Sequence, residues 1–161
     1  MINMNYRKEL IGTIFVHARP LGDEPAEQLL KFHHHKKANE TLKLYVSKKQ
    51  YLSAYTIAFS LLEDRLRAMA IVKERDLRCG NDYQKFVTLG IARVIAFAYD
   101  RTPDNLILIQ NLRNVAINRN KLLHEAMWRI DAITPKDIEH LMKLRALVAN
   151  DLVKMKKEIS Y

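Results

Sequence analysis

An arginine, an asparagine and a histidine lie close together in the second half of the chain: Arg119, Asn120 and His124. An imidazole takes up and releases a proton near neutral pH, and a guanidinium offers a fixed fork of donors to phosphate oxygens. On an ideal helix His124 lies about 140° around the axis from Arg119 and about 7.5 Å along it. Asn120 precedes His124 by one turn, from which its amide can orient the imidazole ring. These residue types at this spacing predict a site for proton transfer and for stabilisation of negative charge.

Arg119 interrupts an otherwise apolar row of side chains. Val115 precedes it by four residues and Leu122 follows by three, so a helix would turn the guanidinium toward the core. A buried charge is costly unless it is paired or opens onto a cleft. Glu63, next to the apolar Leu62, is the candidate supporting carboxylate. Periodicity leaves two alternatives open: a purely structural Arg119–Glu63 pair, or an arginine that lines a cleft.

Apolar residues recur at helical spacing along most of the chain. The strongest row predicts one helix of roughly 30 residues, from about residue 42 to about residue 78. Three further rows predict a weaker segment near 86–97, the helix that carries Arg119, and a closing helix. The four rows are Leu52, Tyr55, Phe59, Leu62, Leu66, Met69 and Lys73; Phe86, Leu89 or Gly90, Arg93, and Ala96 or Phe97; Leu108, Leu112, Val115, Arg119, Leu122 and Ala126; and Leu141, Leu144, Val148, Leu152, Met155 and Ile159.

Two Thr-Pro pairs, at 102–103 and 134–135, predict helix starts. Threonine favours the N-cap position, and proline fits the first turn because its missing N–H is not needed there. Asp137 completes a cap-like Thr-x-x-Asp pattern at the second pair. Short turns between long helices predict an all-α fold, an up-and-down bundle of four to five helices.

Residues 1–22 are predicted to form an N-terminal arm or short strand, and residues 23–161 a single helical domain. The stretch 11–16 is rich in β-branched and aromatic residues, which favour strands. Its apolar part is too short and mixed for a secretory leader, and no run of about 18 apolar residues predicts a membrane span. We therefore expect a cytoplasmic protein.

The composition excludes several classes of protein. A chain of 161 residues that is 48% hydrophobic can fill the core of one domain. Four glycines and four prolines exclude collagen, glycine-rich repeats and a disordered chain. Cys79 is the only cysteine, so a disulfide scaffold is excluded, and without an identifiable base it is a poor nucleophile.

The charge favours a polyanionic partner. Lys and Arg number 27 against 18 Asp and Glu, a net charge of +9. Residues 31–49 hold six lysines and one glutamate, so they carry +5 of that excess. Lys36 and Lys37 in this stretch and Lys121 beside Asn120 are candidate RNA-binding residues, and the alternative for the stretch is a solvated basic face. Adjacent histidines at 33–35 point about 100° apart on a helix and make a poor chelate, so we expect no metal and no cofactor.

The run Arg119-Asn120-Lys121-Leu122-Leu123-His124 resembles the Arg-(Asn/Asp/His)-x-x-x-His motif of HEPN domains. These are small all-helical ribonucleases of toxin–antitoxin and anti-phage systems. The likeness spans about residues 43 to 157, because several further segments occur in a similar order and spacing in HEPN families. Those segments are 61–67, 89–90, 112–114 and 134–138.

The resemblance implies metal-independent cleavage of RNA by a homodimer, in which two motifs meet in one composite cleft. It makes His124 the general acid–base and Arg119 the group that stabilises the phosphorane-like transition state, with Asn120 orienting the pair. The implied products carry a 2′,3′-cyclic phosphate and a 5′-hydroxyl. A regulatory antitoxin is a further implied partner.

One position departs from the family pattern. HEPN toxins paired with a nucleotidyltransferase antitoxin carry a tyrosine two residues after the histidine, where this chain has Ala126; the nearest large aromatic is Trp128. This argues against neutralisation by modification at that position. Two other interpretations stay open: a non-catalytic HEPN-like module that binds RNA or a partner protein, and a scaffold in which Arg119 pairs with Glu63.

Overall fold

The computed structural model describes residues 25–78, 89–125 and 130–159, and in those ranges the chain is all-helical. The α-helices are α2 (Pro25–Ser47), α3 (Tyr51–Arg78), α5 (Ile91–Ala98), α6 (Leu106–His124) and α8 (Pro135–Ile159), with 3-10 turns η1 (Pro103–Asn105) and η2 (Ile130–Ala132). The predicted all-α bundle of four to five helices is confirmed for this part of the chain. The predicted arm at 1–22, Cys79, Ala126 and Trp128 lie outside the described residues.

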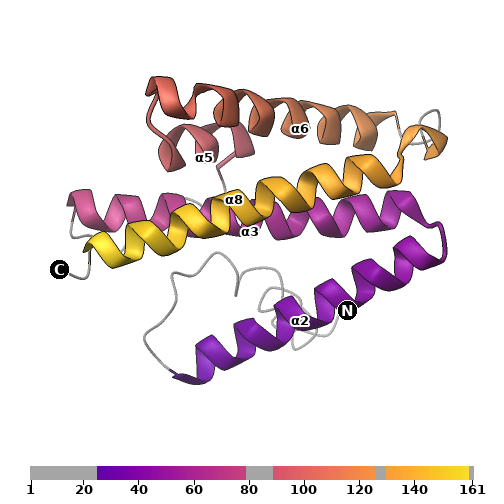
Figure 1. Ribbon diagram of the computed structural model, residues 1–161, viewed down its shortest axis with the longest axis horizontal. Coiled ribbons are helices and arrows are strands. Elements are labelled where there is room, and N and C mark those ends of the chain that lie inside the picture. The colour runs from indigo at the N-terminus through magenta and orange to yellow at the C-terminus, as the bar shows by residue number, and fades with distance from the viewer. Residues whose placement is uncertain (1–24, 79–88, 126–129, 160–161) are drawn as a thin grey trace, which may run out of the picture.

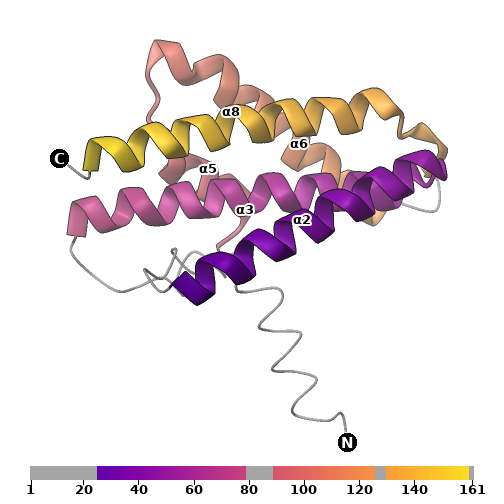
Figure 2. The ribbon, with the colours of Figure 1, turned by 60° about the horizontal axis from the view of Figure 1, so that its bottom comes forward.

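Helices α3 and α8 form the central pair of the bundle (Figure 1). Helix α2 packs on one side of this pair, and α5 and α6 lie on the other (Figure 1). Turned by 60°, the molecule again shows α3 and α8 side by side, with α2 crossing α3 (Figure 2). The long helices α2, α3, α6 and α8 alternate in direction, as in an up-and-down bundle. Within the described residues, no helix is apolar over a length that would cross a membrane.

The core follows two of the predicted rows closely. On α3 the row from Tyr55 to Met69 is buried, and on α8 the row from Leu141 to Leu152 is buried. Lys73, the charged end of the α3 row, forms an ion pair with Asp100 at 2.8 Å. The apolar faces of these two helices therefore meet each other, which is why they form the centre of the bundle.

The predicted long helix from about residue 42 is interrupted, which corrects the sequence-based expectation. Helix α2 ends at Ser47, and α3 begins at Tyr51. The Gln50 amide donates to the Tyr45 carbonyl at 2.9 Å and the Lys49 amide to the Val46 carbonyl at 3.0 Å, the two bonds of a Schellman cap. Lys49 adopts φ 57°, a left-handed conformation for which glycine is the usual residue. Because no glycine or proline marks this turn, the pattern of residue types did not reveal it.

The predicted register of the third segment is also corrected. Helix α5 begins after Gly90 and buries Val94, Ile95 and Ala98. Of the predicted row, Arg93 and Ala96 are exposed, whereas Leu89 and Phe97 are half-buried and pack against the core. The short helix is apolar over most of its circumference, so its orientation is set by packing on α3 rather than by periodicity.

The start of α8 is as predicted. Asp137 accepts hydrogen bonds from the backbone amide of Thr134 at 2.7 Å and from its hydroxyl at 2.8 Å. This reciprocal contact fixes the entry of the chain into α8 at Pro135. At the other Thr-Pro pair, Thr102 makes no side-chain cap, and the chain passes through η1 before α6 begins.

The sequence left open that residues 31–49 form a solvated basic face. The structure shows that this does not hold for all of the histidine tract. His33 is exposed, but His35 is buried against α3 and α8. Its Nε2 lies 2.9 Å from Asp64 Oδ2 and 2.7 Å from an Arg65 nitrogen, and its Nδ1 lies 3.4 Å from an Arg145 nitrogen. The last histidine of the tract thus contributes to a polar network that joins three helices.

Candidate functional site

The side chain of Arg119 lies where α6 packs toward α3. It is half-buried, and its guanidinium carbon lies 5.4 Å from the centre of the Phe59 ring, a cation–π distance. The same guanidinium donates to the Asn120 amide oxygen at 3.2 Å. An aromatic face and a neutral amide thus hold the charge of Arg119 in place.

Tyr55 and Asp137 belong to the same electrostatic neighbourhood. Burial raises the pKa of the Tyr55 hydroxyl, the charge of Asp137 raises that pKa further, and the charge of Arg119 opposes the change. Residues from α3, α6 and α8 therefore act on one another at this point. Sequence reasoning missed Tyr55, although it stands four residues before Phe59 in the same apolar row.

Glu63 does not support Arg119. It forms an ion pair with Arg67 on its own helix, with Arg67 Nε 3.1 Å from Glu63 Oε1. Arg67 also donates to the Leu89 carbonyl at 3.1 Å. The Arg119–Glu63 pair weighed as a scaffold is therefore not formed, because Glu63 pairs with an arginine one turn away on its own helix. A supporting role of Glu63 at the site stays a prediction.

His124 lies on a different face of α6 from Arg119. It is the last residue of the helix and is exposed. Among the described residues it makes no hydrogen bond with Asn120, whose amide oxygen accepts from Arg119 instead. Within one chain the structure thus brings Arg119 and Asn120 together and leaves His124 apart, as the angle of about 140° on a helix predicts.

An exposed stripe leads along α6 to His124. Its members recur at steps of three and four residues and are all exposed: Ile107, Gln110, Asn114, Ile117, Lys121 and His124. Ile107 is 77% exposed and Ile117 51% exposed. We call these six residues the α6 stripe.

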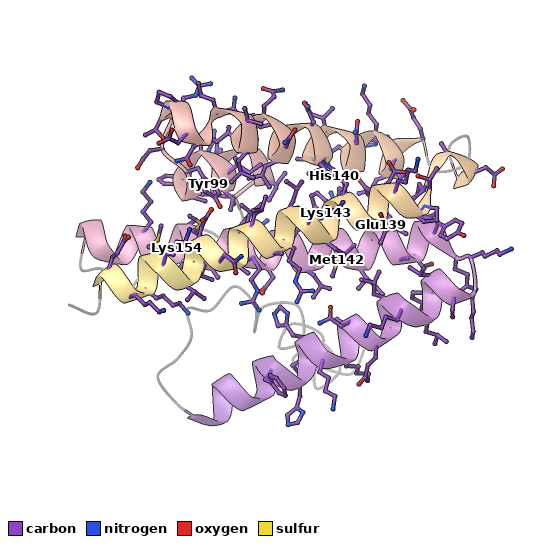
Figure 3. The ribbon with its side chains drawn as sticks, viewed as in Figure 1. Tyr99, Glu139, His140, Met142, Lys143 and Lys154 are labelled. Carbon is purple, nitrogen blue, oxygen red and sulfur yellow. The ribbon has the colours of Figure 1, made fainter. Side chains whose placement is uncertain are left out.

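A second exposed histidine, which the sequence analysis missed, lies on α8. His140 is on the side of α8 toward α6 (Figure 3). It stands eleven residues, or three turns, before Asp151, which accepts a hydrogen bond from Tyr99 at 2.8 Å at the α5 side of the bundle.

The three predicted RNA-binding lysines are exposed but lie on two separate surfaces. Lys36 and Lys37 are on α2, and Lys121 is on α6. The central pair of helices separates α2 from α6 (Figure 1). One straight strand of RNA therefore cannot follow all three lysines across a single face.

In the ranges that the structure describes, no group of three or more histidine, cysteine, aspartate or glutamate side chains is placed to hold a metal ion.

Comparison of the chain with protein-family models, with curated proteins and with solved structures found no match.

Proposed function

We propose that this protein is a metal-independent endoribonuclease of the HEPN type, which acts as a homodimer in a toxin or anti-phage role in the cytoplasm. The observation that carries the proposal is the setting of Arg119. Its guanidinium lies over Phe59 and beside Asn120, and it forms no ion pair with a carboxylate of the described residues. One turn later α6 ends at the exposed His124, which solvent and substrate can reach.

The proposed reaction is an internal transfer at phosphorus. The ribose 2′-oxygen attacks the adjacent phosphorus and loses its proton to the imidazole of one His124, which acts as general base. The bond from phosphorus to the 5′-oxygen breaks, and that oxygen takes a proton from the imidazolium of the second His124 in the dimer. The guanidinium of Arg119 stabilises the added negative charge on the phosphoryl oxygens, and Asn120 holds the guanidinium. The products are a 2′,3′-cyclic phosphate and a 5′-hydroxyl.

Exposed apolar side chains on α6, two of them in the α6 stripe, support the choice of a dimer. Four of the eight large apolar side chains that are exposed in the described residues lie on α6: Leu106, Ile107, Ile117 and Leu123. Exposed apolar side chains gathered on one element are typical of an interface. A two-fold contact centred on the C-terminal half of the stripe, around Ile117 and Lys121, would bring the His124 side chains of two copies together.

A second candidate is a non-catalytic helical module that binds RNA or a partner protein. Arg119 and His124 lie on different faces of α6, which favours this candidate, because within one chain the two side chains cannot both contact the same phosphate. The net charge of +9 is compatible with RNA in either case. The two candidates differ in a single observable, which is cleavage.

The test is cleavage of single-stranded RNA by purified protein in EDTA, with analysis of the 3′ ends. We expect wild type to yield 2′,3′-cyclic phosphate ends and His124→Ala to lose about 100-fold or more of the rate, as the removal of a general acid–base group predicts. His140→Ala is the matched control, because His140 is the exposed histidine of α8 on the side toward α6.

Either of two results would contradict the proposal. Folded wild-type protein that cleaves no RNA, with or without EDTA, supports the binding module. Cleavage that is lost in His140→Ala and retained in His124→Ala moves the proton-transfer role to α8.

A further inference from the structure

A pocket of about 860 Å³ opens at the end of the bundle where α2 passes into α3 and where α8 begins. Its volume is in the range of small-molecule and nucleotide sites. The turn between α2 and α3 and the helix ends beside it supply five of its lining residues: Tyr45, Lys49, Gln50, Tyr51 and Ser53. In Figure 1 this is also the end of the bundle at which α6 terminates.

Two tyrosines make the pocket suited to a flat ring. Tyr45 and Tyr51 both line it, and both are half-buried, so part of each ring remains open to a ligand. Aromatic side chains stack on nucleic-acid bases in proteins that bind single strands, and any base presents a face to them. The Gln50 amide and the Ser53 hydroxyl add a donor and an acceptor each, the groups that read the polar edge of a base.

Lys49 stands in a position that its backbone conformation disfavours. It is the left-handed residue of the Schellman cap, where glycine is common and a side chain costs free energy. Departures from a local rule of this kind occur where a side chain has a function. Glycine would lack the lysine side chain, and Lys49 is one of the residues that line the pocket.

The positive end of α8 is not available as a second anion site. Pro135 and Thr134 line the pocket, but the Asp137 carboxylate already accepts from the Thr134 amide and hydroxyl. Asp131 adds a further negative charge to the lining. The pocket therefore fits a neutral ring with one neighbouring phosphate better than it fits a bare polyanion.

The groove between α2 and α8 offers a comparison. It has a volume of about 550 Å³, and its floor includes Leu42, Val46 and Met142. Glu139, Met142 and Lys143 on its α8 wall are seen in Figure 3. Among the described residues that line it there is no aromatic side chain on which a base could stack.

We propose that the pocket at the α2–α3 turn binds one unpaired base of a single-stranded RNA. The base stacks on Tyr45 and Tyr51, and the Lys49 ammonium contacts the adjoining phosphate. The inference rests on the proposed function for the choice of RNA as the polymer. It adds a recognition site that holds substrate at the end of the bundle where α6 ends with His124.

The test is binding of a fluorescein-labelled single-stranded octaribonucleotide, followed by anisotropy over a series of salt concentrations. All proteins carry His124→Ala so that the RNA stays intact. We expect Tyr51→Ala to weaken binding about 5- to 100-fold, the range for loss of one stacked base, and Tyr51→Phe to bind nearly as wild type. Lys49→Gly is expected to weaken binding and to lower the slope of log K against log salt by about 0.7, the loss of one phosphate contact.

Lys49→Gly also separates loss of function from loss of fold. Because glycine relieves the left-handed strain, this variant is expected to unfold at a higher urea concentration while it binds RNA less well. Lys154→Gln is the matched control, since Lys154 lies near the C-terminal end of α8, away from the pocket (Figure 3). It is expected to change neither the salt slope nor the unfolding midpoint appreciably.

Three outcomes would overturn the inference. The first is RNA binding that Tyr51→Ala and Lys49→Gly leave unchanged; wild-type cleavage in EDTA would then still uphold the proposed ribonuclease. The second is competition by polyglutamate as effective as that by unlabelled RNA, which would indicate an acidic protein ligand. The third is the absence of RNA binding by folded protein.

Discussion

At the scale of single residues, the arginine of the motif is the most informative side chain. Arg119 is held by the Phe59 ring and the Asn120 amide, with no carboxylate among the described residues as an ion-pair partner. A buried salt bridge would make it a structural element, whose loss leaves an uncompensated charge. The observed contacts are weaker, so the side chain contributes little to the fold and leaves its charge available to a ligand.

We predict that Arg119→Ala lowers the free energy of unfolding by only about 1–2 kcal/mol, the scale of a cation–π contact and packing of the side-chain stem. Breaking a buried ion pair would cost about 3–5 kcal/mol. RNA cleavage should fall by about 100-fold or more, because the transition-state charge loses its donor. Urea unfolding and the cleavage assay measure the two quantities. Arg113→Ala on the same helix is the control, and a large loss of stability with normal cleavage would assign Arg119 to the scaffold.

At the scale of elements, one buried polar network ties α2, α3 and α8 together. Asp64 on α3 accepts from His35 on α2, while Arg145 on α8 donates to the Asn39 side chain of α2 at 2.7 Å. Arg65 on α3 completes the set of charges around His35. Such a network fixes how the helices pack, because each member needs its partner in place.

The network predicts a pH dependence of stability. Burial is the main cause that lowers the pKa of His35 below 6.5; the charges of Arg65 and Arg145 also lower it, and Asp64 opposes the change. Below pH about 6.5, His35 is therefore protonated to a greater extent in the unfolded chain than in the folded chain. The free energy of unfolding consequently falls as the pH falls. Above that pH this contribution is constant.

We expect wild-type protein to lose stability between pH about 7 and pH about 5, and His35→Gln to lose less over the same interval. Urea midpoints at several pH values measure this. His33→Gln is the matched control, because His33 is exposed on the same helix. Parallel curves for wild type and His35→Gln would show that His35 does not govern the dependence.

At the scale of the whole molecule, the layered arrangement separates two exposed surfaces. Lys36 and Lys37 lie on α2, and the α6 stripe lies beyond the central pair α3–α8 (Figure 1). The pocket at the α2–α3 turn lies at the end of the bundle where α6 terminates.

We predict that Ile117→Glu dissociates the dimer, since it replaces the exposed apolar side chain at the centre of the proposed two-fold contact with a charge. Sedimentation should change from a dimer to a monomer, and cleavage should be lost with it because each monomer holds half of the composite site. Val153→Glu is the control, an exposed apolar residue on α8 outside the stripe. A wild-type protein that is monomeric while it cleaves RNA would contradict the composite site.

The sequence by itself determined the helical class, the buried rows of α3 and α8, and the cap of α8 at Thr134. Each depends on contacts within a few residues along the chain, which spacing and residue type report directly. It also placed Arg119 on the inward face of its helix and His124 about 140° away from it. The catalytic roles of these residues stay predictions.

Only the tertiary structure decided which partner each side chain meets. Helix α2 ends at Ser47 in a cap whose left-handed residue is Lys49, although no glycine marks this turn in the sequence, and the register of α5 is set by packing on α3. Of three adjacent histidines, His35 is buried, and Glu63 forms an ion pair with Arg67. The physical reason is the same in each case: periodicity shows which face of a helix turns inward, but the neighbour on that face comes from a distant part of the chain or from a competing bond nearby.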